Sequence, residues 1–183
     1  MDLGGLVARN ARTVPDKEGI IFQNNRYNWK QVNERVNTVS HALVDAGVKK
    51  GDKVAMWMYN SDLFMFAFYG IVKTGAVAVP VNFRLAAREA EYIFGNCDAV
   101  AVIFDDVFEP AVREMKPRRD KVAAYFSAGS ERFDGFDPLS DVMASGNTEE
   151  PGIEVDEYDD SEIIYTSGTT GKPKGALLTH HAQ

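Results

Sequence analysis

A short stretch near the end of the sequence combines hydroxyl, glycine and lysine residues in a pattern that suits phosphate binding. Residues 165–175 read Tyr-Thr-Ser-Gly-Thr-Thr-Gly-Lys-Pro-Lys-Gly. Glycines let successive backbone N–H groups approach an anion closely, hydroxyl groups add donors, and lysines add positive charge. The stretch is therefore predicted to hold a polyphosphate.

The spacing of this stretch excludes the Walker loop, which has four residues between its glycines and then opens a helix. Here two threonines separate Gly168 from Gly171, and Lys172 precedes a proline. Because residues 176–179 look like a strand, the loop is expected to join two strands and to lack a helix dipole. A polar hairpin turn without function is the alternative interpretation, and the completeness of the pattern argues against it.

The same stretch closely resembles the phosphate-binding signature of the adenylate-forming superfamily, which includes acyl-CoA synthetases, peptide-synthetase adenylation domains and luciferases. Residues 73–85 read Lys-Thr-Gly-Ala-Val-Ala-Val-Pro-Val-Asn-Phe-Arg-Leu. They resemble the family's second signature in the form typical of acyl- and aryl-CoA ligases. Residues 27–29 and 51–55 resemble the family's opening, so the resemblance spans nearly all of the chain.

The resemblance implies an enzyme that uses ATP, magnesium and CoA. In the family's reaction a carboxylate attacks the α-phosphorus of ATP, pyrophosphate leaves, and the thiol of CoA displaces AMP from the acyl-adenylate. The resemblance assigns seven residues to the β- and γ-phosphates, namely Thr166, Ser167, Gly168, Thr169, Thr170, Gly171 and Lys174. Thr166 is also expected to help hold magnesium, and a fatty acid is preferred over an aryl acid as the substrate.

Other parts of the family's site would lie beyond Gln183: an acidic magnesium ligand, the adenine and ribose contacts, the acyl pocket and a catalytic lysine. The chain is therefore expected to be an N-terminal fragment that is inactive alone, and no catalytic residue is assigned. Two alternatives remain open, a non-catalytic nucleotide-binding or interaction module and a fragment of an aryl-CoA ligase. The coding sequence downstream would separate the enzyme from the module.

Composition limits the other classes of function. The chain has 183 residues and a formal net charge of −7, which argues against nucleic-acid binding. The one cysteine, Cys97, cannot form an intrachain disulfide and is expected to be a small buried residue. The opening residues lack the basic segment and apolar stretch of a signal peptide, so none is expected, and the apolar stretch 63–72 is too short to cross a bilayer. A soluble, cytoplasmic protein is expected.

Strand-like and helix-like segments alternate along the chain, which predicts an α/β fold with a mainly parallel sheet flanked by helices. Asn28 and Gln31 form a candidate capping box at the start of a helix, and Gly47 is a natural stop at its end. One apolar face of 3.6-residue period is expected on this helix, made of Val32, Val36, Val39 and Leu43. The expected strands are 19–23, 53–58, 76–81, 99–104 and 122–126, and the expected helices are 29–46, 62–74, 87–96 and 110–115.

Three regions are predicted along the chain. Residues 1–148 would form an α/β N-terminal subdomain, and residues 149–162, which carry no lysine or arginine, an acidic linker. Residues 163–183 would form the phosphate-loop hairpin that opens the next subdomain, with His180 in a packing or capping role. Apolar surface left exposed where the missing part of the enzyme would pack is expected to favour self-association.

Overall fold

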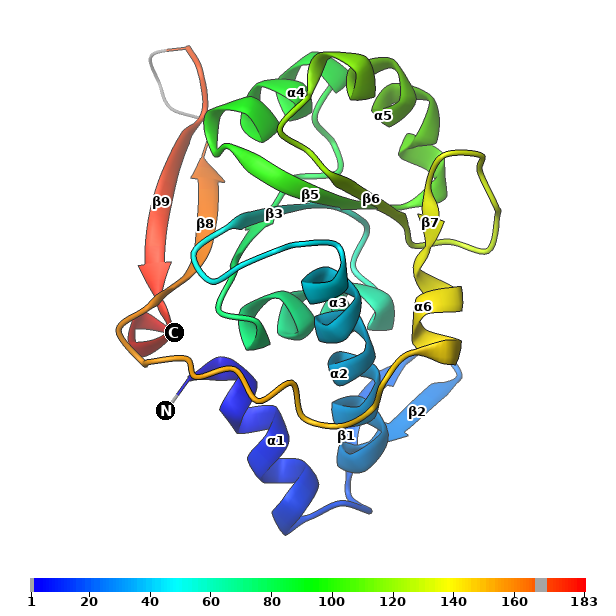
Figure 1. The fold of residues 1–183 in the computed structure, drawn as a ribbon, viewed down its shortest axis with the longest axis vertical. Helices are drawn as coiled ribbons and strands as arrows, with labels where there is room; N and C mark the ends of the chain where they lie inside the picture. The colour runs from blue at the N-terminus through cyan, green and yellow to red at the C-terminus, as the bar shows by residue number, and fades with distance from the viewer. Residues whose placement is uncertain (1, 167–170) are drawn as a thin grey trace.

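A seven-stranded sheet organises the chain (Figure 1). The structure is a computed structural model that describes residues 2–166 and 171–183. In spatial order the strands are β7 (Asp137–Pro138), β6 (Ala124–Ser127), β5 (Ala99–Phe104), β3 (Lys53–Trp57), β4 (Val77–Pro80), β8 (Asp160–Thr166) and β9 (Lys174–Thr179). All neighbouring pairs are parallel except β8 and β9, which run antiparallel at one edge. The predicted α/β class and mainly parallel sheet are confirmed.

Helices cover both faces of the sheet. One face is covered by four helices that share a hydrophobic cluster with inward side chains of β3, β4 and β5. These helices are α1 (Leu3–Thr13), α2 (Trp29–Asp45), α3 (Asp62–Lys73) and α6 (Leu139–Ser145). The other face is covered by α4 (Ala87–Asn96) and α5 (Glu109–Met115), which share a second cluster. Short 3-10 helices occupy Asp106–Phe108, Lys116–Arg118 and His180–Ala182, and β1 (Glu18–Phe22) pairs with β2 (Asn25–Asn28) in a separate hairpin.

The first long helix follows directly from its sequence. The Asn28 side chain accepts from the backbone of Gln31, and the Gln31 side chain accepts from the backbone of Asn28, so the predicted capping box is present. The four apolar residues of the predicted face are fully buried, which contributes roughly 1.5–3 kcal/mol each; they are Val32, Val36, Val39 and Leu43. Gly47, with a φ of +89°, follows the end of α2 as predicted.

Two elements differ from the sequence-based expectations. Helix α1 was not predicted, and β8 begins at Asp160, inside the segment predicted as a linker. Residues 147–159 pass α1 and the middle of α2 in an extended path before they enter the sheet (Figure 1), with hydrogen bonds to Asn33, Asn37 and His41 of α2. Strands β8 and β9 belong to the same sheet as the other strands. The division of the chain into regions at 148 and 162 stays a prediction.

The extended segment 147–159 is fastened to the helices by a buried lysine. Lys73 Nζ lies 2.8 Å from Glu150 Oε2 and donates to the side chains of Asn33 at 2.8 Å and Asn37 at 2.6 Å. Asn37 also donates to the carbonyl of Thr148 at 2.7 Å. The segment is thus acidic, as predicted, but part of it is packed against the domain.

No helix within residues 2–166 and 171–183 is long and apolar enough to cross a membrane.

Candidate polyphosphate-binding site

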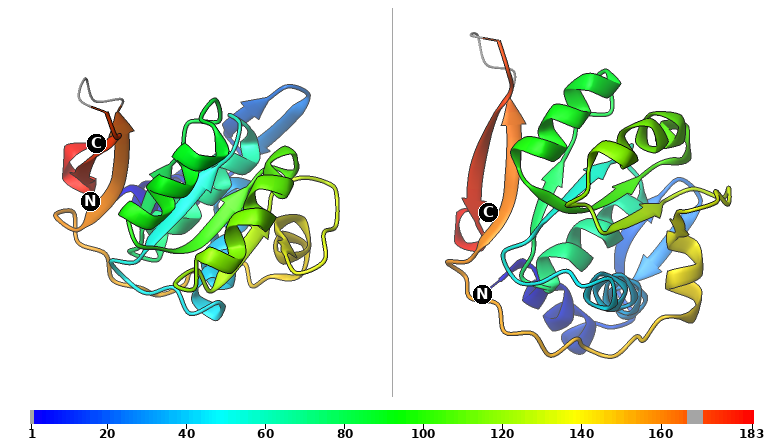
Figure 2. Two further views of the ribbon diagram at one scale, coloured as in Figure 1. Left: turned by 90° about the horizontal axis from the view of Figure 1, so that it is seen from above. Right: turned by 45° about the horizontal axis from the view of Figure 1, so that its top comes forward.

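The predicted phosphate-binding stretch lies on the hairpin of β8 and β9, at the edge of the sheet (Figures 1 and 2). In the register of this hairpin Thr166 faces Lys174, and Tyr165 faces Gly175. Side chains that are directly opposite on antiparallel strands share a face and lie about 4.5–5.5 Å apart at Cβ. The structure therefore brings a hydroxyl and an ammonium group together where the two strands end.

The residues between the strands are only partly described. Ser167, Gly168, Thr169 and Thr170 lie outside the described residues. Gly171 has a φ of +118°, which favours glycine over every residue with a side chain. Its Cβ position has no neighbour within 4 Å among the described atoms, so among these residues it is the backbone conformation that favours the glycine. The expectation that the stretch joins two strands is confirmed by the antiparallel pairing of β8 and β9.

The two lysines of the stretch have different surroundings. Within the described residues, Lys174 has no carboxylate within the 4.0 Å that defines an ion pair. Lys172 Nζ lies 5.0 Å from the centroid of the Tyr92 ring, a cation–π distance. Lys174 is thus the lysine whose charge is available to an anion beside Thr166.

Gly175 has a packing role that the sequence pattern did not reveal. A Cβ at Gly175 would lie 2.7 Å from Ile163 Cγ2 and 3.1 Å from the Tyr165 ring. The Tyr165 ring therefore occupies the space above the glycine across the hairpin. Partial burial raises the pKa of Tyr165 to about 12, so its hydroxyl remains a donor, and it donates to Asn96 Oδ1 at 2.6 Å.

A metal site made only of protein groups is not present in the described residues. No group of three or more His, Cys, Asp or Glu side chains lies close enough there to hold a metal ion. Thr166 is exposed at the end of β8 and offers one hydroxyl oxygen. Magnesium commonly keeps several waters and takes substrate phosphates as ligands, so a single hydroxyl is compatible with a magnesium ion that arrives with a nucleotide.

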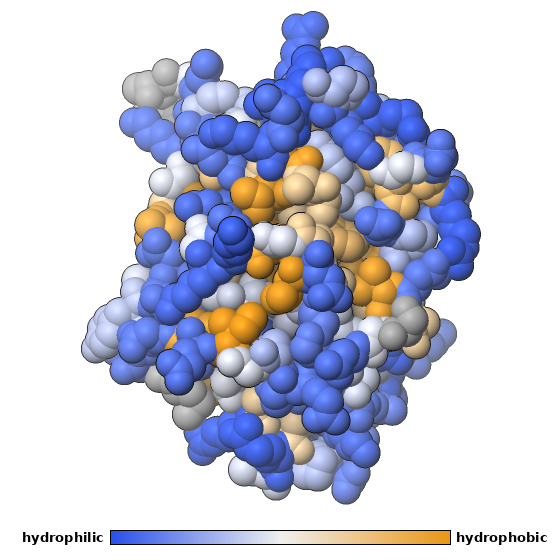
Figure 3. Space-filling model, in the orientation of Figure 1, coloured by the Kyte–Doolittle hydropathy of each residue, from blue (hydrophilic) through white to orange (hydrophobic). Residues whose placement is uncertain are grey.

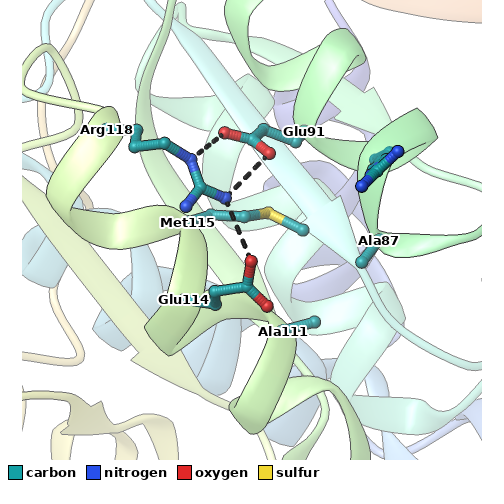
Figure 4. A pocket seen from close by; sticks show the side chains of 7 residues that line it. Ala87, Glu91, Ala111, Glu114, Met115 and Arg118 are labelled. Atoms are coloured by element: carbon teal, nitrogen blue, oxygen red, sulfur yellow. Dashed lines mark hydrogen bonds and ion pairs between the residues drawn. The ribbon is translucent and has the colours of Figure 1, made fainter.

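A cleft lies between α4 and α5 (Figure 4). It has a volume of about 550 Å³ and is lined by Ala87, Arg88, Glu91, Ala111, Glu114, Met115 and Arg118. Arg118 spans the cleft, with Nε 2.9 Å from Glu91 and Nη2 3.6 Å from Glu114. Hydrogen bonding by Arg118 lowers the pKa of Glu91, so these charges already neutralise one another.

Cys97 and His180 take the structural roles predicted for them. Burial raises the pKa of the Cys97 thiol to about 11, and its Sγ lies 3.7 Å from the carbonyl of Phe94. His180 is 3% exposed, and its Nδ1 accepts from the backbone N–H of Leu3 at 3.2 Å. Neither side chain belongs to the hairpin site.

Comparison with known proteins gives one consistent result. The profile of the AMP-binding enzyme family matches residues 7–183. A long-chain-fatty-acid–CoA ligase of Mycobacterium tuberculosis is 33% identical over 183 residues, which is 99% of this chain and 35% of the relative. A medium/long-chain-fatty-acid–CoA/3-oxocholest-4-en-26-oate–CoA ligase of Mycolicibacterium smegmatis is 33% identical and is covered to 33%. The chain thus spans about a third of the length of these relatives.

Solved structures agree with the sequence comparison. The anthranilate CoA ligase AuaEII, solved with anthranoyl-AMP, superposes with a TM-score of 0.93 at 27% identity. That match covers 98% of this chain and 35% of the ligase. A fatty acyl CoA synthetase of Mycobacterium tuberculosis gives a TM-score of 0.87 at 31% identity, over 98% of this chain and 34% of the synthetase.

Proposed function

Because the chain belongs to the family of AMP-binding enzymes, we propose that it is the N-terminal part of an ATP-dependent acyl-CoA synthetase. The protein would activate a carboxylate as its acyl-adenylate and transfer the acyl group to CoA. The observation that carries the proposal is the hairpin of β8 and β9, where Thr166 faces Lys174 beside Gly171. Those are residues that the family's phosphate-binding signature requires.

In this reaction the described residues would act on the leaving pyrophosphate. Negative charge grows there as a carboxylate attacks the α-phosphorus, and donors placed in advance stabilise that charge. Thr166 would donate its hydroxyl and Lys174 would place its ammonium group on the β- and γ-phosphates. We assign Ser167, Gly168, Thr169, Thr170 and Gly171 to the same phosphates by their place in the signature.

Magnesium is part of the proposal. When bound, the ion would neutralise charge on the phosphates of ATP. Thr166 would supply one hydroxyl ligand from the end of β8, and the remaining ligands would be phosphate and water oxygens. CoA is the proposed second substrate, and its own thiol serves as the nucleophile. Cys97 is buried and mostly protonated, so it plays no part.

A long-chain fatty acid is the proposed carboxylate. The support is the 33% identity to the fatty-acid–CoA ligase of Mycobacterium tuberculosis. An aryl acid is the second candidate, and the TM-score of 0.93 to an anthranilate CoA ligase favours it. Assays of the whole enzyme with both acids would separate the two candidates, because the acyl pocket is expected beyond Gln183.

The proposed activity can be tested in a chimera. The chain would replace the matching segment of the Mycobacterium tuberculosis ligase, and fatty-acid-dependent pyrophosphate release and acyl-CoA formation would be measured. We expect activity in the chimera and its loss in the same chimera with Thr166→Val and Lys174→Ala. A folded chimera that binds ATP but forms neither product would favour the alternative of a non-catalytic nucleotide-binding or interaction module.

The cytoplasm is the proposed location, because ATP and CoA are the substrates and the one cysteine is a free thiol.

We also propose that the chain self-associates through the hairpin. Strand β9 is the last strand of the sheet and has an unpaired edge, and Leu177 and Ile164 on the hairpin are 53% and 42% exposed. The hydrophobic residues that gather in the middle of the face seen in Figure 3 lie apart from the hairpin, which is at the left in this orientation. Sedimentation velocity should show association that increases with concentration and decreases in Leu177→Lys. A monomer at all concentrations would contradict the proposal.

A further inference from the structure

Helix α4 touches the hairpin on both sides of its turn. Tyr165, just before Thr166, donates its hydroxyl to Asn96 Oδ1 at 2.6 Å. Lys172, on the other side of the turn, places Nζ 5.0 Å from the centroid of the Tyr92 ring. Tyr92 and Asn96 are four residues apart on α4, so they lie on the same face of the helix.

The sheet alone does not fix this end of the hairpin. Strands β4 and β8 are paired only at Ala78 and Glu162. Thr166, the last residue of β8, therefore lies beyond Glu162, the residue of β8 that is paired with β4. Both contacts with α4 fall in this unsupported part.

The α4 side of these contacts is itself rigidly anchored. Ala90, Ile93 and Phe94 of α4 are buried in the cluster shared with β3 and β5. The rings of Tyr92 and Tyr165 pack against the same cluster. On the hairpin side, Gly175 leaves the space that the Tyr165 ring fills. Two side chains of α4, Tyr92 and Asn96, thus connect the end of the hairpin to the hydrophobic core.

We propose that Tyr92 and Asn96 are positioning residues that hold the end of the β8–β9 hairpin in the geometry that binds polyphosphate. Asn96 holds the end of β8, where Thr166 lies, by accepting the hydrogen bond of Tyr165. Tyr92 fixes the chain that leads to Lys174, by holding the Lys172 ammonium group. The proposal rests on the proposed function of the hairpin, and it adds a helix outside the signature to the binding apparatus.

The test uses the 183-residue chain, and inorganic tripolyphosphate is the probe for binding. NMR spectra of the chain without the probe give the first measurement. In the absence of the probe, the ring current of Tyr92 should shift the ε-methylene signals of Lys172 upfield. Tyr92→Leu should abolish this shift, and Tyr92→Phe should keep it because the ring remains. Hydrogen exchange of the amides of β8 and β9 near the turn should become faster in Tyr92→Leu and in Asn96→Ala.

Affinity for tripolyphosphate gives the second measurement. Tyr92→Leu and Asn96→Ala should each weaken binding about two- to five-fold, and Tyr92→Phe should restore the wild-type value. Tyr165→Phe should have the same effect as Asn96→Ala, and combining the two should add nothing. Unchanged or tighter binding in Tyr92→Leu and Asn96→Ala would overturn the inference and leave the proposed function intact. No binding by the wild-type chain at millimolar probe would instead contradict the proposed function of the hairpin, and with it this role of α4.

Discussion

Gly175 shows that a glycine of the signature can be explained by packing. Its missing side chain makes room for the Tyr165 ring, whose hydroxyl then reaches Asn96. The same hairpin uses Gly171 for a backbone conformation that favours glycine. Gly171 and Gly175 look equivalent in the sequence, but the first is favoured by its backbone conformation and the second by the space that the Tyr165 ring needs.

Gly175→Ala should destabilise the protein and displace Tyr165. The new methyl group would lie 2.7 Å from Ile163 Cγ2, closer than carbon atoms pack, so the strand or the ring must move. Overpacking of this kind costs about 1–3 kcal/mol. Urea denaturation measures the loss, and the ring signals of Tyr165 report the displacement. Ala176→Val, at the neighbouring exposed position, is the control and should change stability by less than about 0.5 kcal/mol.

At the scale of elements, strong local signals made the core of the fold predictable. The helix 29–46 was predicted from a capping box, an apolar face of 3.6-residue period and a stop glycine, and all three features are present. The strands 53–58, 76–81 and 99–104 were predicted from apolar runs, and they pair in parallel at the centre of the sheet. Each of these features depends on residues that are close together in the chain, so it can be recognised from the sequence alone.

The elements and contacts that were missed depend on distant parts of the chain. Helix α1 buries Gly4, Val7 and Ala8 and packs against α2 and α3, so few large apolar residues mark it in the sequence. The contact between Tyr165 and Asn96 joins residues 69 positions apart. In the candidate site, the signature predicted the pairing of two strands but gave no sign of α4. Residues 167–170, which the signature also assigned, are not tested by the structure.

The extended segment 147–159 is an element whose position depends on Lys73. The Lys73 side chain is 7% exposed, and it bonds to Glu150 and to two asparagines of α2. Lys73→Met should reduce the free energy of unfolding by about 1–3 kcal/mol, because it leaves those polar groups without their buried partner. It should also speed hydrogen exchange in the segment.

The matched control for Lys73 is Lys30→Met. Lys30 forms a surface pair with Glu34 at 4.0 Å, and pairs of this kind contribute about 0–1 kcal/mol. Urea denaturation of both variants provides the comparison. Equal losses in the two variants would show that the segment is not fastened by Lys73.

At the scale of the whole molecule, His180 joins the two ends of the described chain. It follows β9 and accepts a hydrogen bond from the backbone of Leu3 at the start of α1. Burial lowers its pKa below the ordinary value of 6.5, although the nearby carboxylates of Asp2 and Asp159 act in the opposite direction. The folded protein therefore keeps His180 neutral at a pH where the unfolded chain binds a proton.

This difference in proton binding predicts a pH dependence of stability. Above pH 6.5 both states are neutral at His180, and the full stability is present. As the pH falls below this value the unfolded state takes up a proton first, so stability should fall by up to about 1.4 kcal/mol per pH unit. His180→Asn keeps an acceptor for Leu3 but does not titrate, so the slope between pH 7 and about pH 5 should become smaller. His181→Asn, which alters a more exposed ring, is the control and should retain the slope.

The last prediction concerns catalysis by the 183-residue chain alone, which should not form acyl-adenylate at a measurable rate. The chain spans 35% of the length of its ligase relative, so it supplies at most the corresponding part of such a site. In the proposed reaction the hairpin would stabilise charge on the phosphates but would not position the carboxylate, and orienting two reactants can be worth roughly 7–11 kcal/mol of the barrier. Carboxylate-dependent pyrophosphate release, measured with enzyme free of contaminating ligase, tests this. Turnover that disappears in the Thr166→Val, Lys174→Ala double variant would show that the chain is sufficient for the reaction.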